Sequence, residues 1–187
     1  MKYKIEELIS SNLEKKYIFF WGHQPSKDGS ITSSCFSQWW MSSFIAEGIE
    51  YKTAEHWMMA KKAELFNDLE TKGKILASKS PMEAKKLGRE VKNYVDEIWL
   101  CNRYNIVKKG NYFKFSQNND LKEFLIKTEN RVIVEASPLD PIWGIGMAAD
   151  QEDILKPEKW KGLNLLGFAL MEVRDTLNSN HSHHETD

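Results

Sequence analysis

The sequence predicts a single compact domain of the α+β class, mostly helical and with a few short strands. Its 187 residues and 41% hydrophobic content suffice for one domain with a sizeable core. Apolar residues recur at helical spacing in several segments, whereas the runs of aromatic or β-branched residues that are typical of strands are few and short. We therefore expect helices to supply most of the core.

The first expected elements are a short helix, a strand and a loop. Residues 1–16 are expected to form an N-terminal helical extension, and residues 17–21 have the aromatic and β-branched composition of a buried strand. Residues 22–34 contain Pro, Gly and several Ser, which predicts a loop. The extension has four apolar residues at helical spacing: Ile5, Leu8, Ile9 and Leu13.

A hairpin over residues 44–51, turning at Glu47 and Gly48, is expected to lead into a central helix over residues 53–66. Thr53 suits the N-cap position of that helix. An apolar stripe runs along one helix face, and Glu55 and Lys62 lie on the same face. The stripe contains Met58, Met59, Leu65 and Phe66.

The two charges on this stripe leave two interpretations open. Residues seven apart are separated by roughly 10 Å along a helix axis, too far for a direct ion pair between Glu55 and Lys62. Each charge then needs another partner, because an unpaired buried charge is costly. Either Glu55 interacts with the helix dipole while Lys62 reaches water, or both groups line a pocket.

A further helix is predicted to begin after Ser80. Residues 67–79 before it are expected to hold a short helical piece or a loop. Ser80 suits an N-cap, Pro81 the first helical position, and Glu83 completes a capping box. A basic stripe follows, which is either a solvated face or a contact for phosphate: Lys85, Arg89 and Lys92.

The second half of the chain is expected to add helices over residues 96–109 and around 121–125, and a buried strand over 132–134. Gly110 suits the end of the first of these helices, and Asn164 is expected to cap the last helix. Residues 178–187 contain no apolar residue and are expected to be a disordered tail, whose three His lack a scaffold to hold a metal.

The charge balance excludes a global attraction to nucleic acid or membrane. Lys and Arg number 26 against 27 acidic residues, for a net charge of −1. The 2 Cys do not form a disulfide framework, and no long apolar segment is present. We therefore expect a cytoplasmic protein without membrane contact.

Residues 135–146 form a second unusual stretch, in which two Pro and two Gly surround Asp140 and Trp143. Pro fixes φ and Gly permits close backbone approach, so this loop is expected to be constrained. The 7 Trp of the chain are either core residues or stacking surfaces for a planar ligand.

Four segments, taken in order, resemble the NADAR family, and the resemblance covers residues 17–177. It implies one NADAR domain over that range. The four segments are Ser37-Gln38-Trp39; Glu55-His56 with Lys62; Ser80-Pro81 with Ala84 and Gly88-Arg89; and residues 135–146 with Asn164–Gly167 and Met171–Arg174.

The resemblance implies an N-glycosidase that hydrolyses the bond between a (phospho)ribose and a base. The implied substrate is either a ribosylamino pyrimidine phosphate of the riboflavin pathway or ADP-ribose attached to guanine, so nucleic acid would enter only as an ADP-ribosylated substrate. No cofactor and no metal are implied. The spacer at residues 22–34 and the stretch 147–159 are longer than in the family's best-known bacterial member, which has Asn in place of Gln38. These differences leave the substrate open.

By motif position, the implied catalytic residues are Glu55, Lys62 and Asp140. Cleavage of an N-glycosidic bond needs a proton for the leaving nitrogen and a group that meets positive charge at C1′. Glu55 suits the acid/base role, Lys62 either attacks C1′ or orients a phosphate, and Asp140 holds ribose hydroxyls or activates water. The alternative is a non-catalytic ADP-ribose or nucleotide-binding module. The expected substrate-binding residues are Trp21, Gly22, Ser37, Gln38, Trp39, His56, Trp143, Gly144, Gly146 and Asn164.

Overall fold

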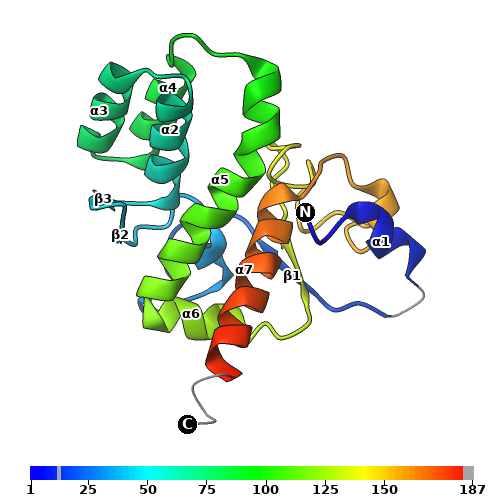
Figure 1. Ribbon diagram of the computed structural model, residues 1–187. Helices are drawn as coiled ribbons and strands as arrows, with labels where there is room; N and C mark the ends of the chain where they lie inside the picture. The colour runs from blue at the N-terminus through cyan, green and yellow to red at the C-terminus, as the bar shows by residue number, and fades with distance from the viewer. Residues whose placement is uncertain (12–13, 183–187) are drawn as a thin grey trace. The chain divides into compact units, whose positions relative to one another are not determined.

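The computed structural model describes residues 1–11 and 14–182, and it confirms a mostly helical α+β fold with a few short strands (Figure 1). Where the sequence predicts a single compact domain, the contacts divide the chain into two compact units. The first unit comprises Met1–Ser37 and Asn119–Asp187, and the second comprises Gln38–Asn118. In the described residues no helix is both long and apolar enough to cross a membrane.

The first unit is built on two parallel strands. β1 (Tyr17–Phe20) pairs with β4 (Val132–Glu135), with Tyr17 opposite Val132 and Phe20 opposite Glu135. The first three residues of β4 are apolar and buried, and α7 (Leu165–Ser182) packs against the strand. The buried strand expected over 132–134 is confirmed. A strand is also present over Tyr17–Phe20, but only Phe20 of it is buried, and Trp21, which was expected to belong to it, lies outside it.

Short helices complete this unit. α6 (Asn119–Ile126) packs against α7, and α1 (Ile5–Ser10) packs against the 3₁₀ turn η2 (Pro157–Lys159). A second 3₁₀ turn, η1 (Ser33–Phe36), packs against β1. Leu13, expected in the first helix, lies outside the described residues.

The predicted tail requires a correction. α7 continues to Ser182, so the backbone of residues 178–182 is helical where the sequence indicated disorder. The polar composition of this segment does not prevent helix formation, because the helix is already nucleated by its packed part. Each residue that is then added gains one backbone hydrogen bond. The remaining residues, 183–187, lie outside the described part of the chain.

The second unit surrounds α2 (Ala54–Leu65) with α3 (Leu69–Ala77), α4 (Pro81–Arg89) and α5 (Asp96–Gln117), as Figure 1 shows. A hairpin of β2 (Phe44–Ala46) and β3 (Ile49–Tyr51) precedes α2. Its turn residues have positive φ, 55° at Glu47 and 76° at Gly48, as a two-residue hairpin loop requires. The predicted hairpin is confirmed.

α2 is buried on more than the one face that its apolar stripe indicates. Eight of its 12 residues are buried, including Glu55, His56 and Trp57. Neighbouring helices can approach this closely because glycines face α2. A Cβ added at Gly88 would lie 2.0 Å from Met59 Sδ, and one added at Gly110 would lie 2.3 Å from Trp57 Cδ1.

Two further corrections concern helix ends. Gly110 was expected to end its helix, yet α5 continues to Gln117, because the missing side chain accommodates Trp57 rather than a C-cap turn. α4 ends at Arg89, so Lys92 is not on its basic stripe; its ammonium pairs with Glu70 at 2.9 Å. Ser80 does cap α4, since its Oγ accepts a hydrogen bond from Glu83 N at 3.2 Å.

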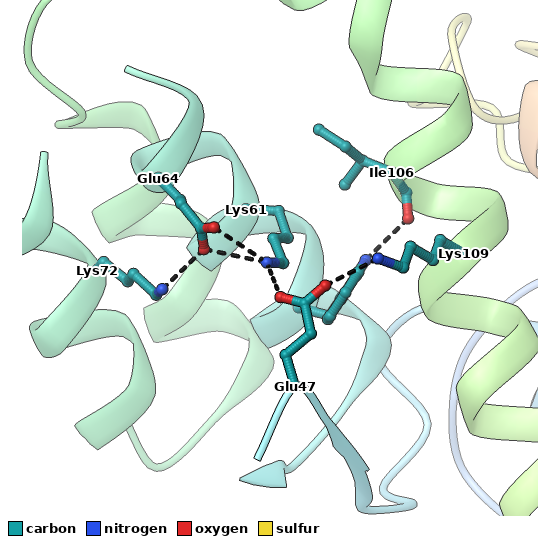
Figure 2. Close-up of polar contacts among 7 residues, drawn as sticks. Glu47, Lys61, Glu64, Lys72, Ile106 and Lys109 are labelled. Carbon is teal, nitrogen blue, oxygen red and sulfur yellow. Dashed lines mark hydrogen bonds and ion pairs between the residues drawn. The ribbon is translucent and has the colours of Figure 1, made fainter. Parts of the chain in front are cut away.

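A cluster of charged side chains ties the hairpin turn to α2 and α5 (Figure 2). The Glu47 carboxylate accepts hydrogen bonds from Lys61 and from Lys109, the latter at 2.8 Å. Lys61 also bonds Glu64, which in turn pairs with Lys72 at 2.7 Å. Because Glu47 is held by two helices at once, the hairpin is fixed to both of them.

Candidate active site

The Glu55 carboxyl group is delivered to the interior by the first turn of α2. Thr53 is the N-cap, and its Oγ1 accepts a hydrogen bond from His56 N at 3.3 Å, which fixes where the helix begins. Glu55 N donates to Gln38 O at 3.0 Å, and the residue is only 2% exposed.

His56 points toward the helix cap and the end of α3. Its Nδ1 lies 2.8 Å from Thr53 Oγ1, and the ring is buried. Burial lowers the pKa of His56, and the positive charge of Lys52 adds to that effect against a hydrogen bond to the Ser78 backbone. These contacts are those of a neutral imidazole with a structural role, and its contact with substrate stays a prediction.

Lys62 lies about two turns further along α2 and is half-buried. Its Nζ donates to Gly88 O at 2.8 Å and lies 4.4 Å from the ring centroid of Tyr94 and 5.6 Å from that of Trp99. Burial lowers the pKa of Lys62, and the charge of Arg89 lowers it further. No carboxylate of the described residues forms an ion pair with it, and its catalytic role stays a prediction.

Gln38 and Trp39 also belong to the second unit. Gln38 is 7% exposed, and its Oε1 accepts a hydrogen bond from Asn111 Nδ2 at 2.7 Å. Trp39 is half-buried, and its ring lies 5.7 Å from Lys85 Nζ. Lys85, a member of the predicted basic stripe, therefore contacts an aromatic face.

Two buried polar residues of α5 were not identified from the sequence. Asn111 and Lys114 are both 0% exposed. With the buried Val107 they follow the spacing i, i+4, i+7 of one helix face. Polar residues at that spacing on an apolar face were the signal that could have identified them.

Asp140 organises the second unusual stretch from within the first unit. Its Oδ1 accepts hydrogen bonds from Ile142 N at 2.9 Å and from Trp143 N at 2.8 Å. One carboxylate oxygen thus closes the turn that presents Trp143, which is half-buried. The predicted constraint on this loop therefore comes from Asp140 as well as from its Pro and Gly residues.

The glycines of this loop allow close backbone packing. A Cβ on Gly144 would lie 2.7 Å from Glu135 O and 2.9 Å from Asp140 O. Gly146 has φ of 65°, which a residue with a side chain rarely adopts. Both glycines shape the turn, and their predicted contact with substrate stays a prediction.

Asn164 serves the strand rather than the helix that follows it. Its Oδ1 accepts from Glu135 N at 3.1 Å and its Nδ2 donates to Ile133 O at 2.9 Å, so its amide acts as an additional strand partner for β4. Asn164 does occupy the position before α7, where its backbone carbonyl accepts a hydrogen bond from Phe168 N at 3.1 Å, but its side chain bonds to β4 instead of capping the helix. A substrate-binding role for Asn164 stays a prediction.

The remaining predicted residues lie at the start of the first unit. Trp21 follows β1 and is 60% exposed, and Gly22 after it has φ of 82°. Ser37 is half-buried and ends η1, where its backbone N donates to Ser34 O at 3.1 Å.

The structure thus groups the predicted site residues in two sets, one in each unit. Glu55 and Gln38 share a backbone hydrogen bond, and the side chain of Gln38 is bonded to Asn111. His56 is bonded to Thr53 at the start of the same helix. A cavity of about 790 Å³ in the first unit contains none of the predicted residues in its lining, which includes Lys16, Arg131 and Met171.

Comparisons with known proteins identify relatives that match most of the chain. A model of the NADAR domain matches residues 19–178. An N-glycosidase of Acanthamoeba polyphaga mimivirus is 44% identical over 165 residues, which cover 86% of this chain and 95% of that protein. N-glycosidase YbiA of Escherichia coli is 30% identical over 131 residues, covering 70% and 73%.

A comparison of folds also identifies a NADAR relative. The NMR structure of the Escherichia coli protein YbiA superposes with a TM-score of 0.71 and 26% identity, covering 92% of this chain and 91% of that one. The family match and the similarity to the viral relative extend over most of the sequence, including the segment of Glu55 and Lys62. This chain therefore belongs to the NADAR family.

Proposed function

We propose that Glu55 is the general acid and base of an N-glycosidase whose substrate joins a ribose or phosphoribose to a base. The protein is a hydrolase of N-glycosyl bonds, as its curated relatives from a virus, a cyanobacterium and an enterobacterium are named. The observation that carries the residue assignment is the Glu55 carboxyl group, buried at the first turn of α2.

The proposed reaction requires Glu55 to protonate the nitrogen that leaves C1′. Burial makes the proton-carrying form of a carboxyl group more accessible, and this form is the one an acid catalyst needs. After the C1′–N bond breaks, the same carboxylate can accept a proton from the water that attacks C1′. Water supplies the hydroxyl group of the sugar product, so the bond cleavage is balanced without a cofactor.

Two roles are proposed for Lys62, and the lowered pKa of its amine supports the first. As a nucleophile, its neutral Nζ would form a bond to C1′ while the C1′–N bond of the substrate breaks, and water would later release the sugar. As a cation, Lys62 would orient a phosphate or a ribose hydroxyl. Borohydride trapping during turnover separates the roles, because only a covalent sugar adduct adds mass at Lys62.

Asp140 and Trp143 are assigned supporting roles. One oxygen of Asp140 is occupied by the turn, so its other oxygen would hold ribose hydroxyls or orient water. The half-buried ring of Trp143 would stack on the base. The remaining predicted residues, including Trp21, Ser37 and Trp39, would contact the base or the sugar.

The substrate class follows from the same chemistry. Either a ribosylamino pyrimidine phosphate or ADP-ribose on guanine has the required C1′–N bond, and we expect the enzyme to act on it in the cytoplasm. Nucleic acid would be a partner only when it carries ADP-ribose. A protein with this role needs no contact with a membrane.

The assignment of Glu55 is tested by replacing it with Gln. Glu55→Gln keeps the shape of the side chain and removes its proton transfer, so the release of base should fall by about 10²–10⁴-fold. The measurement is chromatographic detection of free base, together with calorimetric binding of substrate.

Glu64→Gln is the matched control, because Glu64 lies on the same helix and its side chain is 41% exposed. It should retain wild-type turnover. If Glu55→Gln is as active as Glu64→Gln, Glu55 is not the acid catalyst.

A further inference from the structure

Two buried amides of the second unit form a short hydrogen-bonded relay next to Glu55. Asn111 Nδ2 donates to Val107 O, one turn earlier on α5, at 2.9 Å. The same Nδ2 donates to Gln38 Oε1 at 2.7 Å. We call Val107, Asn111 and Gln38 the amide relay.

The relay determines the direction in which both amides face. A backbone carbonyl can only accept, so Asn111 must turn its NH₂ group toward Val107 O. The second hydrogen of that group then needs an acceptor, which is Gln38 Oε1. Gln38 Nε2 consequently points away from Asn111, and rotating either amide by 180° would bring two donors or two acceptors together.

The outer end of the relay is a buried donor. Gln38 is 7% exposed, and its Nε2 has no hydrogen-bond partner among the described residues. Asn111 is 0% exposed, and its Oδ1 also has no hydrogen-bond partner among those residues. A buried polar group without a partner is unfavourable, and native proteins rarely retain one. An acceptor supplied by a bound molecule would remove that cost at Gln38.

Gln38 is also attached to the backbone of the proposed acid. Its carbonyl oxygen accepts the hydrogen bond from Glu55 N at 3.0 Å. The buried donor and the Glu55 carboxyl group therefore extend from residues that share one backbone hydrogen bond. In the proposed reaction Glu55 protonates the leaving base, so the base is the part of the substrate nearest to this pair.

We propose that Gln38 Nε2 donates a hydrogen bond to a ring carbonyl or ring nitrogen of the leaving base, and that Asn111 is a positioning residue that holds Gln38 in this orientation. The inference rests on the proposed N-glycosidase function and adds the recognition of the base to it. Electrons move onto the base as the C1′–N bond breaks, so this hydrogen bond strengthens in the transition state and raises kcat.

Turnover by two variants tests the relay, and a third variant serves as the control. Gln38→Met removes the donor at similar size and should lower kcat by about 10²-fold or more with a smaller change in KM. Asn111→Leu leaves Gln38 free to rotate and should lower kcat about tenfold, the equivalent of one hydrogen bond. Wild-type kcat in Gln38→Met would overturn the proposal.

Asn102→Leu is the matched control for Asn111→Leu. Asn102 lies on the same helix and its Nδ2 makes the same bond to the carbonyl four residues earlier, Ile98 O, at 2.8 Å. It is not part of the relay, so its replacement should leave kcat and KM unchanged. An equal loss in Asn102→Leu and Asn111→Leu would mean that helix stability, rather than positioning, explains both.

A measurement without turnover separates the relay from the proposed function. In ¹⁵N-labelled wild-type protein, guanosine or uridine should shift the side-chain NH₂ signals of Gln38 downfield, whereas ribose 5-phosphate should not. Asn111→Leu should abolish the shift. A shift with ribose 5-phosphate alone, or no shift with any of the three probes, overturns the relay, while absence of base release by the wild-type protein overturns the enzyme function instead.

Discussion

Neighbouring lysines on α2 have opposite environments. Lys61 is held by two carboxylates, Glu47 and Glu64, and lies 5.0 Å from the Trp57 ring. Lys62 has aromatic neighbours and a backbone carbonyl instead, and burial lowers its pKa. A half-buried amine without an acid is unfavourable for stability, and for this reason we propose a chemical role for Lys62 and a structural role for Lys61.

Replacing each lysine by Met should therefore separate activity from stability. Lys62→Met is expected to abolish base release and leave the free energy of unfolding unchanged or slightly higher, because a partly desolvated charge is removed. Lys61→Met is expected to retain activity and lose about 1 kcal/mol of stability with its ion pairs. Urea denaturation and the base-release assay measure the two quantities, and equal activity of the two variants would refute the assignment.

The pH dependence of the wild-type enzyme distinguishes the two roles proposed for Lys62. If Lys62 is the nucleophile, only its neutral form reacts, so activity should rise with pH and level off below the ordinary lysine pKa of 10.5. If Lys62 acts as a cation, activity should instead fall over that range as the charge is lost.

The sequence identified Glu55 and Lys62 because apolar spacing placed two charges on a buried helix face. Burial of Glu55 is confirmed. Spacing could not show that Gln38, whose carbonyl accepts from Glu55 N, also meets Asn111, since these two residues are 73 positions apart and only the tertiary fold brings them together. Asn164 was misassigned for a related reason: its position predicts a cap, but its amide bonds to β4, which precedes it by about 30 residues.

Helices of the second unit approach α2 through glycines, and this makes their packing sensitive to a single methyl group. Gly110→Ala would place a Cβ 2.3 Å from the indole of Trp57, whose Nε1 is fixed by a hydrogen bond to Ile106 O at 2.8 Å. The ring cannot move without breaking that bond, so we expect a loss of about 1–3 kcal/mol in unfolding free energy.

Gly73→Ala in α3 is the matched control, because no atom lies within 4 Å of the added Cβ. It should stabilise the protein by about 0.5–1 kcal/mol through helix propensity. Thermal and urea denaturation of both variants give the comparison, and a stabilised Gly110→Ala would show that α5 does not pack on Trp57 as described.

The ion pairs of Glu47 in the hairpin turn contribute to the stability of the protein (Figure 2). Hydrogen bonds from Lys109 and Lys61 lower the pKa of Glu47 to about 2. The contribution of a carboxylate with a lowered pKa is complete above its ordinary value of 4.5 and is lost as pH falls toward 2. The group is 45% exposed, so solvent screening limits its contribution to about 1 kcal/mol.

Glu47→Gln should therefore destabilise the protein by about that amount at pH 7, and the difference from wild type should shrink at pH 3 and in 1 M salt. Glu123→Gln, which loses one exposed pair with Lys127, should change stability by a few tenths of a kcal/mol at most. A pH-independent difference for Glu47→Gln would exclude the ionic explanation.

At the scale of the whole molecule, the mostly helical α+β class was predictable from the sequence, because periodicity and turn residues are local signals. The hairpin, α4 and the β1 and β4 strands followed from such signals. The pairing of β1 with β4 and the division into two units depend on contacts between distant segments, which periodicity does not report. The continuation of α5 beyond Gly110 likewise reflects the packing of that glycine on Trp57, and the continuation of α7 reflects propagation from its packed part; composition encodes neither.

Release of base by the wild-type protein would show that this NADAR protein breaks N-glycosidic bonds. A panel of ribosylamino pyrimidine phosphates and ADP-ribosylated guanine compounds would be incubated with the protein, and free base and free sugar would be separated by chromatography. We predict that at least one compound yields base and sugar in equal amounts. Tight calorimetric binding of these compounds, with no base released over hours, would contradict the claim and identify a binding module instead.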